Sequence, residues 1–344
     1  MKENYRAWEI NCDEFYSQKT EEDRMRFLIQ FAVLAPSSHN SQPWKFSVSD
    51  SEIIVEPDSS RALPKSDINH RQLFVSVGCA IENLVIAADY YGFKTAVAYD
   101  LQKEWAETIQ ISFERPKEIP HQPKNHTIFS IPLRHTNRTP YENRLPGETF
   151  INWVKGLADN RIHINCITDK DQKNSIADVV IQAGIKAMRD KGFREELSQY
   201  VKSNVTGDKV GMPGFGFGMP TPLSFIAAKL LKHFNMNKIT KKKDKRLLKD
   251  QTPLFVIIST ILDEKQLWIQ AGRLYERIAL EAERRGIKTA PMAAAVQIGT
   301  FYQDFQRILG ITHRPQVFFR VGYSNRSTAH SPRLLVKDVL VRTI

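Results

Sequence analysis

The sequence has few of the features that define disulfide-rich or metal-binding proteins. It contains three cysteines, Cys12, Cys79 and Cys166, which are odd in number and far apart, and neither a Cys-x-x-Cys nor a His-Glu-x-x-His pattern occurs. These spacings support neither a disulfide framework nor a zinc site. We therefore expect no metal and a reducing compartment.

Targeting and membrane-spanning segments are also missing. The first twenty residues alternate charged and apolar side chains and lack the apolar core of a signal peptide. Apolar stretches such as residues 253–262 are far shorter than the ~20 residues that cross a bilayer. We expect a soluble, cytoplasmic protein with no membrane partner.

Common phosphate-loop and hydrolase motifs are absent. No P-loop, no Gly-x-Gly-x-x-Gly after a strand and no nucleophile elbow occurs. The run from Gly214 to Gly218 has alternating glycines, but the phenylalanines between them argue against a phosphate loop. These absences disfavour the common nucleotide-binding and serine-hydrolase classes.

Positive charge is the main compositional bias of these 344 residues. The formal net charge is +11 and the pI is about 9.4, so an anionic partner is expected, such as a phosphate-bearing cofactor, a nucleic acid or a membrane surface. The densest run lies between Lys238 and Lys249 and includes Lys241 to Arg246. Because it lacks interleaved aromatics, we interpret it as a solvated linker or helix face and expect no nucleic-acid partner.

Helical and strand patterns alternate along the chain, and two early strands look like a hairpin. This predicts an α+β fold rather than a doubly wound parallel sheet. Helices are expected at 21–34, 72–91, 148–158, 170–189 and 265–285, and strands at 44–49, 51–57, 95–99, 108–113, 162–167, 253–260 and 316–321. A Pro-rich connector at 114–124 would separate two halves, and residues 334–344 would form a C-terminal extension.

Residues 207–222 combine five glycines and three prolines with Phe and Met side chains. Such a segment cannot be regular structure, yet it is too apolar for a simple exposed linker. We interpret it as an ordered loop that covers something.

The first candidate site is the loop from Ala35 to Trp44, which packs hydroxyl and carboxamide side chains between two prolines. Prolines lower the entropy lost on ordering, so donors and acceptors can be held in place for a planar heterocycle. An ordinary helix-stop turn is the simpler alternative. The loop closely resembles the Pro-Ser-Ser-x-Asn-x-Gln-Pro-Trp segment of the nitroreductase family. That family is known for homodimers in which this segment reaches the FMN of the partner subunit, which implies cofactor contacts for Ser37, Ser38, Asn40 and Gln42.

The second candidate site is the run from Ile131 to Arg138, in which Arg134 and Arg138 flank Thr136. Guanidinium and hydroxyl groups suit a phosphate, although a surface loop with two arginines is also common. The run resembles the entry motif that begins nitroreductase chains and holds the FMN phosphate. Here the motif lies in the middle of the chain, as it does in the Acg-like branch of the family, which this chain resembles. The resemblance implies two nitroreductase-like halves fused as an intramolecular pseudo-dimer.

The third candidate site follows an expected helix that Gly272 interrupts, which normally implies close backbone approach. For the helix itself, plain core packing is the simpler interpretation. The segment after it, with Pro291, Met292 and Ala293, resembles the family loop whose backbone amides approach the flavin ring. Where the family often has Glu-Gly, this chain has Ala293-Ala294, but a backbone donor needs no particular side chain.

Further cations come from other parts of the chain. Arg333 lies where the family places phosphate-binding Lys and Arg, whereas Arg320 could equally be a strand residue paired with a carboxylate. The first half also has a set of residues that resembles an Asp-x-x-x-Arg pattern of the Acg-like branch, namely Arg61, Asp67 and Arg71. These residues could form a structural ion pair or contact the ring.

The resemblance implies an N-terminal half at residues 1–125 and a C-terminal half at 126–344, with a lid-like loop at about 205–222. It implies an FMN-dependent oxidoreductase that takes electrons from NAD(P)H and reduces small nitroaromatic or quinone-type acceptors with restricted access to the flavin. No catalytic side chain is expected, because the cofactor carries the chemistry. The alternative is a flavin-sequestering protein with little turnover. The pseudo-dimeric chain could dimerise further.

Overall fold

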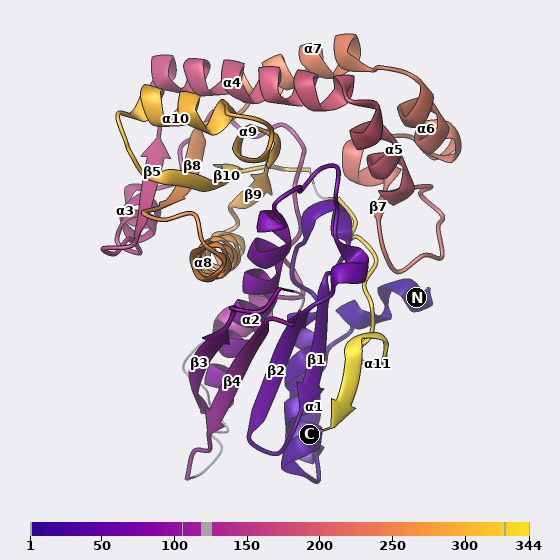
Figure 1. Ribbon diagram of the computed structural model, residues 1–344, viewed down its shortest axis with the longest axis vertical. Coiled ribbons are helices and arrows are strands. Elements are labelled where there is room, and N and C mark those ends of the chain that lie inside the picture. Colours follow the sequence, from indigo (N-terminus) through magenta and orange to yellow (C-terminus); the bar gives the residue numbers. More distant parts are fainter. Residues whose placement is uncertain (1, 105, 118–125, 327, 344) are drawn as a thin grey trace.

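The structure is a computed structural model that describes residues 2–104, 106–117, 126–326 and 328–343. Residues 118–125, which include most of the expected connector, lie outside this description. The mixture of helices and antiparallel strands confirms the α+β class (Figure 1).

The first sheet has five strands in the order β11-β1-β2-β4-β3. The expected hairpin is present, because β1 and β2 pair antiparallel from Trp44–Pro57 to Val48–Ile53. Strand β11 comes from the far end of the chain and pairs in parallel with β1, which the sequence analysis did not foresee. The bounds are β1 Trp44–Val48, β2 Glu52–Pro57, β3 Lys94–Asp100, β4 Thr108–Glu114 and β11 Leu340–Thr343.

The second sheet has four antiparallel strands in the order β5-β8-β10-β9. All seven residues of β8 are buried, as expected for a strand covered on both faces. Figure 1 shows α4 and α10 on one side of this sheet and α8 on the other. The bounds are β5 Ile162–Ile167, β8 Leu254–Thr260, β9 Lys288–Pro291 and β10 Arg314–Gly322, and a short pair, β6 Val201–Lys202 and β7 Met212–Pro213, stands apart.

All five expected helices form, with ends that differ by at most three residues. Thr20 caps the first of them by accepting the Asp23 N–H at 3.0 Å. Helices α5, α6, α9, α10 and α11 were not expected. The helices are α1 Glu21–Ala32, α2 Arg71–Tyr90, α3 Glu148–Lys155, α4 Lys170–Arg189, α5 Lys191–Tyr200, α6 Thr221–His233, α7 Asn237–Lys249, α8 Lys265–Arg284, α9 Ala294–Gln297, α10 Phe301–Leu309 and α11 Val336–Val339.

Helices α2 and α8 cross at two glycines, one on each helix. A Cβ on Gly272 would lie within 3.0 Å of the Val75 carbonyl, and a Cβ on Gly78 within 3.0 Å of the Ile269 carbonyl. The close approach expected at Gly272 is therefore present and is reciprocal. The apolar window of α2 is long enough to span a membrane, but 89% of it is buried inside the structure, so this helix forms the centre of the core.

Two further segments differ in part from expectation. Residues 207–222 are mostly irregular, but they contain β7 and a 3-10 turn at Gly214–Phe217, and their last two residues begin α6. The lysine run forms α7, in agreement with the helix-face interpretation.

One hydrophobic core includes Leu84 of α2, Val256 of β8 and Val339 of α11. The division into halves at residue 125 and the pseudo-dimer stay predictions.

Candidate functional site

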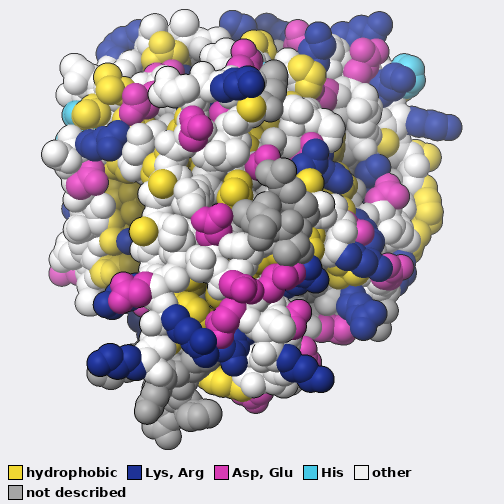
Figure 2. Space-filling view, turned by 60° about the horizontal axis from the view of Figure 1, so that its bottom comes forward, with side chains coloured by type: hydrophobic (Ala, Val, Ile, Leu, Met, Phe, Trp, Pro, Cys, Tyr) yellow, Lys and Arg dark blue, Asp and Glu magenta, His cyan; other side chains and the backbone are white. Residues whose placement is uncertain are grey.

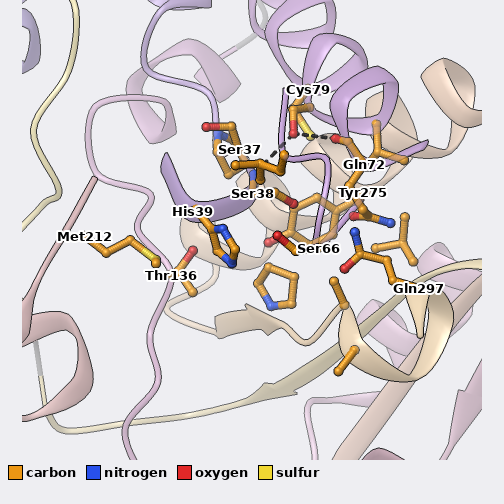
Figure 3. A pocket seen from close by; sticks show the side chains of 18 of the residues that line it. Ser37, Ser38, His39, Ser66, Gln72, Cys79, Thr136, Met212, Tyr275 and Gln297 are labelled. Carbon is orange, nitrogen blue, oxygen red and sulfur yellow. Dashed lines mark hydrogen bonds between the residues drawn. The ribbon is translucent and has the colours of Figure 1, made fainter. Parts of the chain in front are cut away.

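A cavity of about 230 Å³ lies where the loop after α1 meets α2, α8 and the end of β9. Figure 3 shows Thr136 and Met212 at one end of this cavity, and Gln72 and Gln297 at the opposite end. A smaller cavity of about 50 Å³ shares five lining residues with the larger one, namely Pro36, Ser37, Thr136, Arg138 and Met212. The two cavities therefore adjoin at the Thr136 end.

The loop that lines both cavities has a strained backbone. His39, Asn40 and Gln42 have φ angles of 53°, 55° and 53°, in the left-handed region that residues other than glycine rarely occupy. Such residues cost on the order of 1–3 kcal/mol each and persist only where their surroundings hold them. Concentrated strain of this kind is a mark of functional loops.

Two carboxamides hold this loop in place. Asn40 donates to the carbonyls of Gly211 and Pro332, both at 2.9 Å. Gln42 donates to the Lys209 carbonyl and accepts the Leu334 N–H, both at 2.8 Å. Gln42 lies outside the lining of both cavities, and Asn40 lines only the smaller one. The cofactor contact expected of Gln42 stays a prediction, whereas its bonds give it a bracing position.

Serine side chains and a histidine present polar groups to the larger cavity. Ser37 Oγ accepts the Gln42 N–H at 2.9 Å, and the Ser38 N–H donates to Ser76 Oγ at 3.3 Å. Burial lowers the pKa of His39 to about 4, assisted by the charge of Arg138. His39 is therefore neutral at pH 7, with an Nδ1 atom that has no partner among the described residues.

Three arginines converge on the smaller cavity. Arg134, Thr136 and Arg138 alternate along an extended segment that lies beside β9, held there by the bond from the Asn137 N–H to the Thr289 carbonyl at 3.0 Å. Alternate residues of an extended segment face the same side. The arginines of the smaller cavity are Arg134, Arg138 and Arg333.

These cations have few compensating partners. Arg333 donates to Asn40 Oδ1 at 2.6 Å and to the Leu34 carbonyl at 3.2 Å. Burial, together with the charge of Arg134, lowers its pKa to about 9. Arg333 Nε and Arg134 Nη1 are buried without a hydrogen-bond partner among the described residues. Arg134 is paired with Glu276, but buried guanidinium N–H groups that lack a partner favour a further acceptor, such as an anion, between the arginines.

Arg138 is the cation most available to a ligand. Its guanidinium lies 5.1 Å from the centre of the Phe217 ring, and within the described part of the chain it forms neither a hydrogen bond nor an ion pair. It lines both cavities. The residues at this end therefore fit a phosphate group whose attached ring would extend into the larger cavity.

Glu276 of α8 is the buried counter-charge of Arg134. Its Oε1 lies 3.0 Å from Arg134 Nε, and both side chains are buried. Neither carboxylate oxygen has a hydrogen bond to a described residue. Burial raises the pKa of Glu276 to about 7, against the opposing charge of Arg134.

This pKa predicts a pH dependence of stability. A carboxyl whose pKa is higher folded than unfolded binds more protons in the folded state, so its contribution to the free energy of unfolding falls as pH rises between the two values. The window runs from the unfolded value of about 4.3 to about 7. We expect wild type to lose stability relative to Glu276→Gln between pH 5 and pH 8. Urea unfolding of both proteins across this range measures it, and parallel curves would contradict it.

The segment after β9 divides between the cavity and the core. Pro291 and Ala293 line the larger cavity. Met292 does not, because its N–H donates to the Phe318 carbonyl at 2.9 Å and its side chain packs on the second hydrophobic cluster. The ring contact expected of Met292 stays a prediction, because Met292 is not among the residues that line the cavity.

The remaining expected ionic residues have structural partners. Arg320 bonds to Thr252 Oγ1 at 3.2 Å and to the carbonyls of Asn137 and Thr139, rather than to a carboxylate. Arg61 pairs with Asp58 at 3.2 Å. Asp67 accepts the N–H groups of Gln72 and Leu73 at the start of α2, and Arg71 donates to the Val296 carbonyl.

Several lining residues were missed by the sequence analysis. Cys79 is one position beyond Gly78, and Tyr275 is nearly one turn beyond Gly272. The glycines that mark the helix crossing could have indicated which faces of α2 and α8 meet there. Gln72 and Gln297 carried no comparable signal, whereas Met212 belongs to the segment 207–222 that was expected to cover something.

No protein-family profile matches this sequence. Sequence relatives in Mycobacterium tuberculosis strain H37Rv include "Putative NAD(P)H nitroreductase Rv3131", which is 24% identical over 307 residues that cover 88% of this chain and 86% of the relative. Another, "Putative NAD(P)H nitroreductase acg", is 20% identical over 311 residues that cover 87% and 89%.

Solved structures align more loosely and over less of the chain. The FMN-dependent nitroreductase NfnB from Mycobacterium smegmatis in complex with NADPH aligns with a TM-score of 0.42 and 11% identity, over 62% of this chain and 95% of NfnB. A nitroreductase with bound FMN from Desulfitobacterium hafniense has a TM-score of 0.38 and 14% identity, over 63% and 97%. These sequence relatives match the chain over nearly nine-tenths of its length, so the chain is similar to proteins named as nitroreductases.

Proposed function

We propose that this protein is an FMN-dependent oxidoreductase that takes electrons from NAD(P)H and passes them to small nitroaromatic or quinone-type acceptors. The observation that carries the proposal is the adjoining of two cavities, one with three converging arginines and one lined by a strained polar loop. The similarity to relatives named as NAD(P)H nitroreductases supports the same function.

The residues of the smaller cavity, where the three arginines converge, would hold the phosphate of FMN. Arg138 offers a guanidinium that no described residue pairs with, while Arg134 and Arg333 add charge and Thr136 adds a hydroxyl. The larger cavity would take the ring, with Ser37, Ser38 and His39 on one wall, and Pro291 and Ala293 on another. When bound, the flavin supplies the electron transfer itself.

The protein contributes position and exclusion of water to this chemistry. The bracing bonds of Asn40 and Gln42 keep the loop rigid, so the cavity is formed before the ligand arrives. Because His39 is neutral at pH 7, it offers a neutral imidazole and not a further cation beside the ring. No described side chain needs to act as a general acid or base.

The absorbance spectrum of the purified protein tests this proposal. We expect a yellow protein that releases FMN on denaturation, and whose flavin is bleached anaerobically by NADPH or NADH. A colourless protein that also fails to bind added FMN would overturn the proposal. A bound flavin that neither nucleotide bleaches would favour the sequestering alternative, which the small size of the cavity makes worth testing.

We also propose that residues 205–222 act as a lid that limits access to the ring. Gly211 is fixed to the strained loop, because its N–H donates to the Asn40 carbonyl at 3.3 Å and its carbonyl accepts from the Asn40 side chain. Phe215 N–H donates to Asn204 Oδ1 at 2.6 Å. These bonds hold Met212, which lines both cavities, over their junction.

Shortening Met212 should therefore widen the entrance. We expect Met212→Ala to raise kcat/KM several-fold for menadione and to change it less for the slimmer nitrofurazone. Met219→Ala is the matched control, since Met219 belongs to the same segment but lines neither cavity. Equal rates for the two variants with both acceptors would remove the lid from the proposal.

A further inference from the structure

Helix α6 turns its large apolar side chains outward. Leu223, Phe225 and Ile226 are 42%, 60% and 50% exposed, and Phe234, just after the helix, is 60% exposed. The inward positions are small: Ser224 accepts the Asn204 N–H at 2.9 Å, and Ala227 is buried. A helix on the surface of a water-soluble domain normally has the opposite arrangement.

Basic side chains surround this apolar group. Lys229 and Lys232 are exposed on the same helix, and Lys241, Lys242 and Lys245 are exposed on α7. None of these five lysines forms an ion pair with a residue that the structure describes. Figure 1 shows α6 and α7 at the outer edge of the molecule, away from the first sheet. On the different face seen in Figure 2, by contrast, basic and acidic side chains are interspersed.

We infer that α6 and α7 form a surface that binds peripherally to an anionic lipid bilayer. Exposed Phe, Leu and Ile can enter the boundary between headgroups and acyl chains, while lysines bind lipid phosphates. This inference departs from the sequence analysis, which expected no membrane partner; peripheral binding requires no spanning segment. The inference does not depend on the cofactor.

Two other occupants fit this surface less well. A second copy joined through the same patch would bring the lysines of both chains together, and such like-charge contacts are unfavourable. Nucleic acid would match the lysines but would leave the aliphatic side chains exposed, because its backbone contacts are electrostatic. The lipid surface is the partner that satisfies both kinds of side chain.

Co-sedimentation of the full chain with vesicles tests the inference. Vesicles of phosphatidylcholine alone are compared with vesicles that also contain phosphatidylglycerol. We expect at least tenfold tighter partitioning to the anionic vesicles, weakened by salt. Both Phe225→Ser with Ile226→Ser, and Lys241→Glu with Lys242→Glu, should lower it at least tenfold.

A charge-matched control separates this surface from the overall basic charge. Lys19→Glu with Lys103→Glu makes the same change in net charge at exposed loop positions outside α6 and α7, and this variant should bind like wild type. The inference is wrong if anionic vesicles are not bound, or if the control loses as much binding as the α7 variant. The inference is also wrong if the serine variant keeps full binding to anionic vesicles, or if the surface proves to bind duplex DNA instead. It is wrong as well if sedimentation equilibrium shows that the apolar residues hold two copies of the chain together.

Discussion

Gly272→Ala should lower the free energy of unfolding by at least ~3 kcal/mol, which is at the upper end of what overpacking costs. The added Cβ would lie within 3.0 Å of the carbonyl carbon and oxygen of Val75, in the middle of α2. Backbone inside a packed helix cannot rotate away as a side chain can. Relief would require α2 and α8 to separate, and that would disturb both the core and the cavity between them.

Gly184→Ala provides the control within another helix. A Cβ at Gly184 of α4 has no atom within 4 Å, so the change should raise stability by about 0.5–1 kcal/mol through helix propensity alone. Urea unfolding of both variants measures the contrast. Similar effects of the two substitutions would show that the crossing is looser than described.

Arg138→Ala should weaken FMN binding by about 10- to 100-fold, the loss expected when a charged hydrogen-bond donor to a phosphate is removed. Arg138 reaches both cavities and has no hydrogen-bonded or ion-paired partner in the described part of the chain. Its removal should therefore leave the melting temperature nearly unchanged. The FMN affinity of the Arg138→Lys variant should lie between those of wild type and Arg138→Ala, because lysine keeps the charge and loses the paired hydrogen-bond geometry.

Arg144→Ala is the matched control for this experiment. Arg144 belongs to the same connecting segment, but its side chain is 63% exposed and lies over the Tyr323 ring at 3.7 Å. Fluorescence titration of FMN into each apoprotein gives the dissociation constants. If the Arg138→Ala and Arg144→Ala variants bind FMN equally well, the phosphate does not lie in the smaller cavity.

Local sequence patterns predicted most of the regular elements, because periodicity is a local property. The strand Ile162–Ile167 and the helix Lys170–Arg189 have the same bounds in the structure. Helix α6 was missed although Leu223, Ile226 and Leu230 have helical spacing, and no local pattern shows that its large apolar residues face outward. The pairing of β11 with β1 depends on a contact between distant segments, which no local pattern contains.

The candidate site was predictable as a set of segments but not as a set of atoms. Nine of the eleven expected cofactor-binding residues line one of the two cavities, and Gln42 and Met292 do not. Both exceptions lie next to or near lining residues in the chain, where neighbouring side chains point in different directions. The left-handed backbone at His39 and Asn40 was hidden as well, since neither residue is glycine.

The position of β11 has a consequence for synthesis of the chain. Strand β1 ends at Val48, but the strand that covers its outer edge begins at Leu340. A ribosome delivers β1 and its hairpin partner long before β11, and all strands of the second sheet emerge in between. Until Leu340 emerges, the nascent first sheet has an open edge that can pair with other chains. A truncation just before this strand should therefore promote aggregation while leaving the candidate site residues encoded.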